Sequence, residues 1–212
     1  MKIGLMGGTF NPIHNGHLII SEYARSTMDL DKIIFIPAGN PPHKDFKSLL
    51  DGSARKEMIL LATLSNPFFD ISSIEIDRNG KSYTIDTIFE LKKKYKEDEL
   101  FFIIGADSLY ELNNWKDFEK LLGSTSFIVF KRPNFDNDNI DNRISKLKSL
   151  YGANIEKIEA PLIEISSSDI RNRIKQGLSI KYLVPEPVEE YIIKKEFYRE
   201  GKDGSLDWRS YS

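Results

Sequence analysis

Short apolar runs alternate along this chain with longer segments of helical periodicity, and this alternation constrains the fold more than any other feature. Most of the runs are rich in β-branched or aromatic residues and end in glycine, proline or a charged residue, as buried strands do. Strands that alternate with helices at this spacing form crossover units, which give a parallel sheet with helices on both faces. We therefore predict a single α/β domain with a Rossmann-like, doubly wound parallel sheet.

The apolar runs predict strands over Ile3–Met6, Ile33–Ile36, Ile71–Ile76, Leu100–Ile104, Phe127–Phe130 and Ile155–Ile158. The segments between and after them predict helices over His17–Met28, Ser53–Ser65, Ile85–Lys96, Trp115–Leu122, Ile140–Tyr151, Ser168–Gln176 and Pro187–Lys195. Asp51 or Ser53 can cap the second of these helices, and Gly177 suits a left-handed residue at the end of the sixth.

The composition is that of an ordinary globular protein, with 212 residues, 40% of them hydrophobic and 29% charged. We expect one domain over residues 1–198 and a polar tail over residues 199–212. A net charge of −2 gives no basic footprint for nucleic acid, and the absence of cysteine excludes disulfides and thiol chemistry. No apolar stretch approaches the roughly 18 residues of a membrane-spanning helix. We therefore expect a cytoplasmic protein without nucleic-acid or membrane partners.

The loop after the first predicted strand reads G-G-T-F-N-P-I-H-N-G-H. Gly7 and Gly8 allow the backbone to approach a bulky anion closely. Gly16 places His17 at a helix start, where free N–H groups and the helix dipole attract phosphate. His14 and His17 face the same side if the turn is helical. The loop carries neither the dehydrogenase pattern G-x-G-x-x-G nor a Walker lysine, so it predicts a different kind of phosphate site.

Two other interpretations of this loop stay open at this point. His14 and His17 could bind a catalytic zinc ion together with His43, because three histidines suffice for such a site. Alternatively, the glycines form a plain turn and the histidines only cap a helix.

A serine-rich stretch near the other end of the chain, I-S-S-S-D-I-R, runs from Ile165 to Arg171. Ser167 and Ser168 open a predicted helix and supply hydroxyl and backbone donors at its positive end. Arg171 adds a planar, permanently charged fork suited to phosphate. By itself the stretch is better explained as a serine-capped helix with a surface arginine, because serine caps are common.

The loops after the second and third strands offer groups for a second substrate. Lys44 is a compact cation suited to an acceptor phosphate, although a solvated loop lysine has the same sequence. Tyr83 and Thr84 lie at the predicted first turn of a helix, where backbone N–H groups could receive a carboxylate. A glycine turn followed by a capped helix would use the same residues.

The loop after the fourth strand contains an acidic and an aromatic candidate. Asp107 follows Gly105 at the carboxyl edge of the sheet, where an acidic side chain can accept ribose hydroxyls. Trp115 offers a flat surface for an aromatic ring, a cationic pyridinium included. A tryptophan that simply packs into the core is the alternative.

Two of these segments together resemble a known superfamily. Residues 7–17 are similar to the G-G-T-F-D-P-x-H-x-G-H signature of the HxGH nucleotidyltransferases, and residues 165–171 to their I-S-S-T-x-I-R signature, with serine for threonine. Asn11 replaces the usual aspartate, and we expect that position to be structural. The resemblance implies catalytic roles for His14, His17, Lys44 and Arg171. It implies ATP binding by Gly7, Gly8, Thr9, Phe10, Gly16, Gly105, Asp107, Ser167 and Ser168.

The middle of the chain narrows the resemblance to the bacterial nicotinate-mononucleotide adenylyltransferase family, over residues 1–198. The elements P-P-H-K, S-Y-T-x-D-T, G-A-D, W-K and K-R-P occur in the order of that family. The resemblance implies that the nicotinate carboxylate meets the backbone near Thr84 and that the ring stacks on Trp115. The acceptor-binding residues it implies are Asn40, Lys44, Tyr83, Thr84, Trp115 and Arg132.

The expected substrates are then ATP and nicotinate mononucleotide, with Mg²⁺ bridging the triphosphate and no metal-binding residues of the protein's own. If the histidines act protonated, activity falls as the pH rises past their pKa, for which the reference value is ~6.5. The alternatives are nicotinamide mononucleotide, pantetheine phosphate or a CTP-dependent alcohol-phosphate acceptor, and a non-catalytic nucleotide sensor. A homodimer is left open.

Overall fold

The six strands form one sheet in which every pair of neighbours is parallel, in the order β3-β2-β1-β4-β5-β6. The computed structural model describes residues 1–40, 49–131, 137–161 and 163–199. The strands are β1 (Lys2–Gly8), β2 (Lys32–Pro37), β3 (Phe69–Ile71), β4 (Glu99–Gly105), β5 (Ser126–Lys131) and β6 (Ile155–Glu159). This is the doubly wound order, in which the chain reverses direction across the sheet between β1 and β4.

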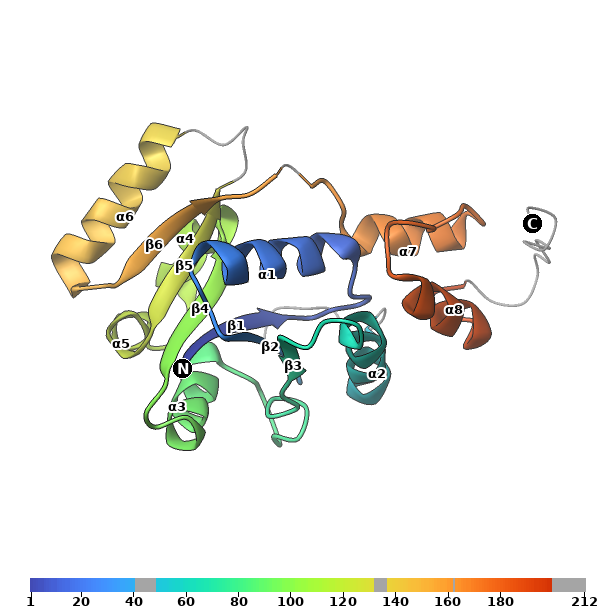
Figure 1. Ribbon diagram of the computed structural model, residues 1–212, viewed down its shortest axis with the longest axis horizontal. Coiled ribbons are helices and arrows are strands. Elements are labelled where there is room, and N and C mark those ends of the chain that lie inside the picture. The colour runs from blue at the N-terminus through green and yellow to red at the C-terminus, as the bar shows by residue number, and fades with distance from the viewer. Residues whose placement is uncertain (41–48, 132–136, 162, 200–212) are drawn as a thin grey trace.

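The helices in the described part are α1 (Asn15–Thr27), α2 (Gly52–Thr63), α3 (Thr84–Lys94), α4 (Ala106–Glu111), α5 (Phe118–Ser124), α6 (Asn137–Tyr151), α7 (Ser167–Lys175) and α8 (Glu186–Lys194), with a 3₁₀ turn, η2 (Leu112–Asn114). Figure 1 shows α7 and α8 at the opposite end of the molecule from α6. The predicted α/β class, the parallel sheet and its Rossmann-like winding are confirmed.

The two faces of the sheet carry separate hydrophobic clusters, because successive side chains of a strand point to opposite faces. In β4, Phe102 and Ile104 join the cluster that packs against α3, α4, α5 and α6. Phe101 and Ile103 join the cluster that packs against α1, α2, α7 and α8. The strands are therefore buried on both sides, which explains why their sequences are apolar throughout rather than alternating.

The predicted helix punctuation is confirmed at both positions. The Asp51 carboxylate caps α2 by accepting a hydrogen bond of 2.8 Å from the backbone N–H of Ser53. Gly177 follows α7 with a φ of 69°, in the left-handed region that glycine adopts without steric cost. The backbone N–H of Leu178 then donates to the carbonyl of Arg173 at 2.8 Å, which closes the helix end.

Among the predicted elements that were wrong in extent, two show the physical reason. The strand predicted over Ile71–Ile76 ends at Ile71. Beyond it, the hydroxyl of Ser73 donates to the Asp77 carboxylate at 2.7 Å, while the Ser73 carbonyl accepts from the backbone N–H of Asp77 at 2.9 Å. These local bonds turn the chain away from the sheet, in the way that serine and aspartate side chains compete with regular structure.

The helix predicted over Trp115–Leu122 begins only at Phe118, because Asp117 adopts a left-handed φ of 50° immediately before it. Helix α4 and the η2 turn were not predicted. Leu109 and Leu112, three positions apart and both fully buried, were the helical signal that this segment carried.

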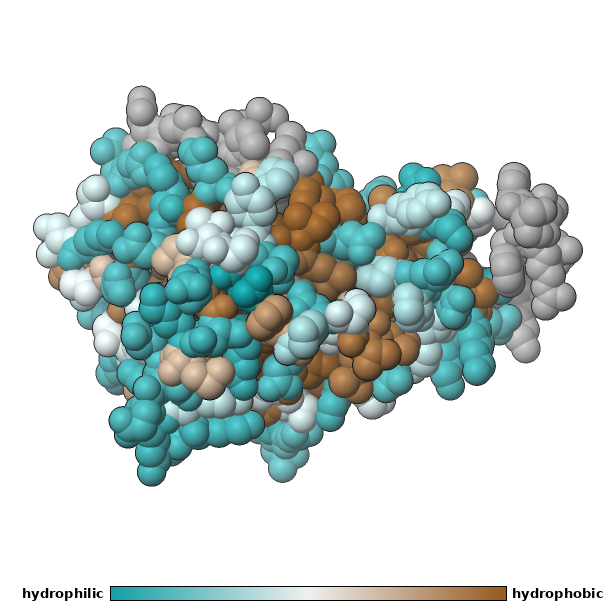
Figure 2. All heavy atoms as spheres, in the orientation of Figure 1, coloured by the Kyte–Doolittle hydropathy of each residue, from teal (hydrophilic) through white to brown (hydrophobic). Residues whose placement is uncertain are grey.

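The view in Figure 2 shows a largely hydrophilic surface with hydrophobic side chains gathered over α2. The exposed large hydrophobic residues of α2 and the turn after it are Leu60, Leu64 and Phe68. None of the helices in the described residues is long and apolar enough to cross a membrane. The predicted division into a domain of residues 1–198 and a tail of residues 199–212 stays a prediction, because residues 200–212 lie outside the described part.

Candidate active site

A cavity of about 1010 Å³ opens where the strand order reverses, beside the carboxyl ends of β1 and β4. Its walls come from the loop after β1, the start of α1, the segment before α3, the start of α4 and the segment that leads into α7. Ligands of doubly wound sheets bind at this place, because the loops on either side of the reversal diverge and leave a crevice.

Side chains directly behind the glycine loop leave little room for larger residues. A Cβ atom at Gly8 would lie 2.9 Å from the ring of Phe10, and one at Gly16 would lie 3.0 Å from Nδ1 of His14. Phe10 itself has a left-handed φ of 48° and is 1% exposed. The ring thus packs into the core beneath the loop, and it is the backbone of Gly7, Gly8 and Thr9 that faces the cavity.

The two histidines stack against each other at the entrance of α1. His14 is the residue before the helix, and its ring centroid lies 3.7 Å from that of His17. The His14 backbone N–H donates to Nδ1 of His17 at 3.3 Å. The helix begins at Asn15, two residues earlier than predicted. Both rings line the cavity. Their common orientation follows from the i, i+3 spacing.

His14 is an unusual histidine because its side chain is buried and incompletely bonded. It is 6% exposed, and its Nδ1 atom has no hydrogen-bond partner in the described part of the chain. Burial lowers the pKa of His14 from its ordinary value of 6.5 to about 4. Without ligand the ring is neutral at physiological pH, so the reference value near 6.5 does not apply to His14.

The serine stretch forms hydrogen bonds with the glycine loop, although the two segments are far apart in the sequence. Ser166 caps α7 by accepting from the backbone N–H of Asp169 at 3.1 Å. The Ser167 hydroxyl donates to the Pro12 carbonyl at 2.8 Å, and Nη1 of Arg171 donates to the Asn11 carbonyl at 2.8 Å. The two sequence signatures therefore form one structural unit.

Asn11 has the structural role expected of its position. It is 5% exposed, and its Oδ1 atom accepts hydrogen bonds from the backbone N–H of Leu50 at 3.3 Å and from the Tyr198 hydroxyl at 2.8 Å. The following peptide bond to Pro12 is cis. Burial is the main cause that raises the pKa of Tyr198, so its hydroxyl remains a donor. The asparagine thus connects the loop to the segment just before α2 and to the end of the described chain.

The opposite wall of the cavity holds the residues expected to bind an acceptor. Tyr83 precedes α3 and Thr84 is its first residue, so the unpaired backbone N–H groups of the first turn lie at this wall. Trp115 lines the cavity and also packs edge-on against Phe102, with ring centroids 6.2 Å apart. Both interpretations of the tryptophan, core residue and cavity wall, hold in part.

A family model described as "Cytidylyltransferase-like" matches residues 5–173. A protein of Thermoanaerobacter named "Probable nicotinate-nucleotide adenylyltransferase" is 48% identical over 207 residues, 97% of this chain and 98% of that protein. One of the same name from Moorella thermoacetica is 47% identical over 96% of this chain and 94% of that protein. The chain belongs to the nicotinate-nucleotide adenylyltransferase family.

The fold of the family is also seen in a solved structure. The Plasmodium falciparum nicotinic acid mononucleotide adenylyltransferase complexed with NaAD matches 93% of this chain and 97% of its own, with a TM-score of 0.77 and 20% identity. At that identity the likeness bears on the fold alone. The family resemblance drawn from the sequence motifs is confirmed by the curated relatives.

The structure gathers most of the predicted site residues of this adenylyltransferase family member around one cavity. Those on its wall are Gly7, Gly8, Thr9, His14, Gly16, His17, Tyr83, Thr84, Gly105, Asp107, Trp115 and Ser167. Four described residues lie off the wall: Phe10 in the core, Asn40, whose carbonyl accepts from the backbone N–H of Ser82, and Ser168 and Arg171 on α7. Lys44, Arg132 and the histidine of the zinc alternative, His43, lie outside the described residues.

Among the wall residues that were missed from the sequence, two carry charged groups with defined partners. Lys116 places its Nζ atom 4.5 Å from the ring centroid of Tyr83 and 3.1 Å from the Asp86 carboxylate. Glu75 accepts a hydrogen bond of 2.7 Å from the Thr87 hydroxyl, and burial raises the pKa of its carboxyl group. The lysine is adjacent to Trp115 and could have been found there. Glu75 lay within a run interpreted as strand, which hid it.

Proposed function

We propose that the protein transfers the adenylyl group of ATP to nicotinate mononucleotide, giving nicotinate adenine dinucleotide and pyrophosphate. One observation carries the proposal: a single cavity joins the histidine loop after β1 to the start of α3 and Trp115. The first wall offers groups for phosphates and the second offers a helix start and an aromatic ring for a pyridine carboxylate. Both substrates would meet between them.

The reaction is an in-line displacement at phosphorus. An oxygen of the acceptor's phosphate forms a bond to the α-phosphorus of ATP while the bond to the β-phosphate oxygen breaks, and pyrophosphate leaves. Because two anions must approach each other, the protein's contribution is positioning and charge stabilisation. His14 and His17 would donate to phosphate oxygens at the start of α1, and Lys44 would add a cation. Arg171 would act beside them while holding the carbonyl of Asn11.

The metal that family membership implies would arrive with the nucleotide. In the described residues, no group of three or more histidine, aspartate or glutamate side chains could hold a metal ion. Mg²⁺ is usually bound through substrate phosphates, waters and one or two carboxylates. Asp107, on the cavity wall, is the carboxylate placed to assist. The ion would offset the negative charge of the triphosphate.

The acid is the expected acceptor rather than the amide. The first turn of α3 presents backbone N–H groups with the positive end of the helix dipole, and Lys116 carries a cation beside Tyr83. A carboxylate gains more from these groups than a neutral amide does. The half-buried Glu75 on the same wall remains compatible with this, because burial favours its neutral form.

Pyrophosphate release from ATP and Mg²⁺, measured in parallel with nicotinate mononucleotide and nicotinamide mononucleotide, tests the proposal. We expect a strong preference in kcat/KM for the acid. Equal use of both acceptors would keep the adenylyl transfer and discard the role of the α3 start. Release with neither would contradict the proposal and favour pantetheine phosphate or a sensor that binds nucleotide without reaction.

A homodimer and a cytoplasmic location stay predictions. The hydrophobic side chains Leu60, Leu64 and Phe68 on and after α2 are the exposed surface that would support self-association. Sedimentation of the purified protein would decide this, since a monomer mass at high concentration would exclude the dimer.

A further inference from the structure

Arg55 is a charged side chain within the core of the protein. It lies in the first turns of α2, and only 1% of it is exposed, which makes it the largest of the fully buried side chains. Arginine is almost never fully buried unless its charge is paired. Its surroundings therefore require a specific explanation, and the phosphate and acceptor groups described above do not supply one.

The guanidinium donates to three backbone carbonyls from three separate segments. Nε donates to Leu50 at 2.9 Å, just before α2, and Nη1 donates to Thr9 at 2.8 Å, in the loop after β1. Nη2 donates to Gly39 at 3.5 Å, in the loop after β2. The rigid fork of the guanidinium fixes the relative positions of the three carbonyls, which a flexible ammonium could not do.

The contact to Thr9 reaches the phosphate side of the cavity. Thr9 lines that cavity, and its carbonyl belongs to the same planar trans peptide as the N–H of Phe10. Because the two groups of a trans peptide point in opposite directions, holding the carbonyl from one side sets the direction of the N–H on the other. Arg55 thus orients a backbone donor of the loop without touching a ligand.

The contact to Gly39 reaches the acceptor side. Gly39 lies directly against Glu75, which lines the cavity. A Cβ atom at position 39 would lie 1.9 Å from the carbonyl oxygen of Glu75, so only glycine permits this approach. Gly39 is therefore held between Arg55 on one side and Glu75 on the other.

The charge of Arg55 is not matched by an ion pair with any described residue. The ionisable groups that act on it from a distance are Asp51, Glu75 and Tyr198. A buried charge without a close counter-charge costs stability, and a hydrophobic residue of similar size is often equal or better for folding alone. Stability therefore does not account for the arginine.

We propose that Arg55 is a positioning residue of the transfer reaction, which sets the phosphate loop at Thr9 and the acceptor loop at Gly39 at their working separation. The inference rests on the proposed function, because that separation matters only if two substrates react across the cavity. A displacement of about 1 Å between reacting groups costs on the order of a hundredfold in rate. The expected signature is a loss of turnover in protein that remains folded.

The test compares R55K and R55A with R25A, at a temperature where unfolding curves show all variants folded. Arg25 is the matched control, since its guanidinium pairs with Glu22 on α1 and contacts neither loop. We expect kcat to fall about tenfold in R55K and about a hundredfold in R55A, and the Kd for ATP to rise severalfold in both. R25A should keep the kcat and Kd of the wild type.

Chemical rescue distinguishes positioning from general damage. Guanidinium chloride at non-denaturing concentrations should restore part of the kcat of R55A, whereas sodium chloride at the same ionic strength should not. Wild-type kcat and Kd in R55K would overturn the inference, as would a lack of rescue in folded R55A. If R55A does not fold, the kcat and Kd of R55K alone decide whether the inference holds.

The two proposals fail in different ways. A wild-type protein that forms no dinucleotide would contradict the proposed function, whereas a wild-type protein that forms it beside an R55K variant of unchanged kcat and Kd would overturn only the inference about Arg55. The inference requires weaker ATP binding in R55K than in R25A, and equal Kd values would overturn it.

Discussion

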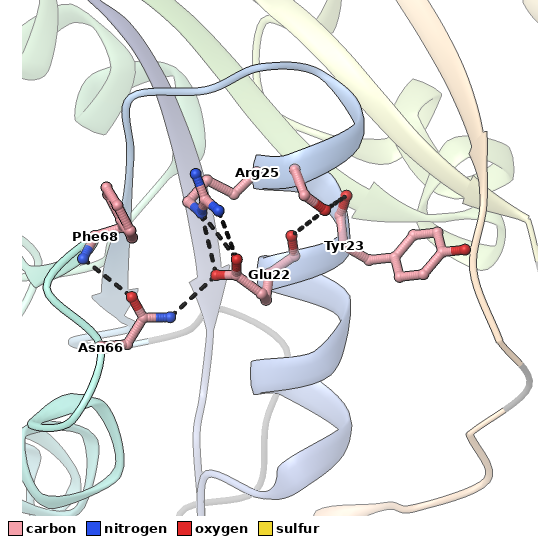
Figure 3. A network of polar contacts seen from close by, with 6 residues as sticks. Glu22, Tyr23, Arg25, Asn66 and Phe68 are labelled. Atoms are coloured by element: carbon pink, nitrogen blue, oxygen red, sulfur yellow. Dashed lines mark hydrogen bonds and ion pairs between the residues drawn. The ribbon is translucent and has the colours of Figure 1, made fainter.

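The two ends of α1 differ in how their polar side chains are hydrogen-bonded. At the carboxyl end, Arg25 forms hydrogen bonds of 2.7 to 3.1 Å with the Glu22 carboxylate. Asn66 donates to the same carboxylate at 3.0 Å and accepts from the backbone N–H of Phe68 at 3.0 Å. Figure 3 shows this network linking the helix to the turn after α2. The guanidinium also lies 4.3 Å from the Phe68 ring centroid.

At the amino end one buried polar atom is left available. Nδ1 of His14 has no hydrogen-bond partner in the described part of the chain, and the ring lies against that of His17 at the cavity. Buried polar atoms are nearly always bonded in folded proteins, so such an exception requires an explanation. The comparison teaches that α1 pairs its charged side chains at the carboxyl end, whereas at the amino end it keeps one imidazole nitrogen at the cavity ready for a ligand.

Removing the imidazole of His17 should produce the largest effect on activity. We expect H17A to lose on the order of 10²–10³ in kcat, because a donor to the transition state disappears. Steady-state pyrophosphate release measures this loss. The unfolding free energy should fall by only about 1 kcal/mol, since His17 accepts one partly buried hydrogen bond. A variant that keeps most of the wild-type turnover would remove the catalytic role.

The second prediction concerns stability as a function of pH. In the unfolded chain His14 binds a proton below its ordinary pKa of 6.5, whereas in the folded protein it does so only below about 4. Folding therefore loses stability as the pH falls through this window, by about 3 kcal/mol in total. Denaturant unfolding of wild type and H14N between these pH values measures the difference.

We expect H14N to lack this component of the pH dependence, because asparagine does not titrate. A matching slope in both proteins would show that other groups cause the acid sensitivity. ATP should oppose the effect in the wild type, since bound phosphate stabilises the charged imidazole and raises its pKa.

Replacing Asn11 should have an intermediate effect on stability. Its side chain is hydrogen-bonded, in contrast to Nδ1 of His14, although both residues belong to the loop after β1. N11A should lower the unfolding free energy by about 2 kcal/mol, since Leu50 and Tyr198 lose their acceptor. N11D is the matched control, because a carboxylate can accept both bonds. Chemical denaturation compares the two, and equal losses would show that the acceptor is unimportant.

The smallest effect should come from the paired end of α1. The side chains of Arg25 and Glu22 are 21% and 42% exposed, so solvent screens their interaction. We expect E22Q to lower the unfolding free energy by about 0.5 kcal/mol at low salt and by less at high salt. Its kcat should equal that of the wild type, and a clear loss of kcat would show that the two ends of the helix are coupled.

The fold was predictable from the sequence because its signals are local and repeated. Strands such as Ile33–Ile36 are apolar over their full length, and the helices between them carry caps such as Asp51. The errors fell where local polar bonds decide the conformation. Ser73 and Asp77 turn the chain out of the sheet, and Asp117 adopts a left-handed conformation that no periodicity indicates.

The site was predictable where its residues sit in motifs and not where they act through the fold. His14 and His17 could be found because the spacing and the neighbouring glycines are distinctive. Arg55 could not, since an arginine within a helical segment is normally an exposed residue. Its burial depends on three carbonyls that are far from it along the chain or hidden in loops.

The hydrogen bonds from α7 to the glycine loop affect the order in which parts of the protein can form during synthesis. Ser167 and Arg171 contact Pro12 and Asn11 across separations of 155 and 160 residues, and Tyr198 contacts Asn11 across 187. A ribosome releases the loop well before these partners. The emerging chain can pair its central strands before its active centre exists. The cavity is thus completed only after α7 has emerged, and a chain terminated before α7 would lack its complete wall.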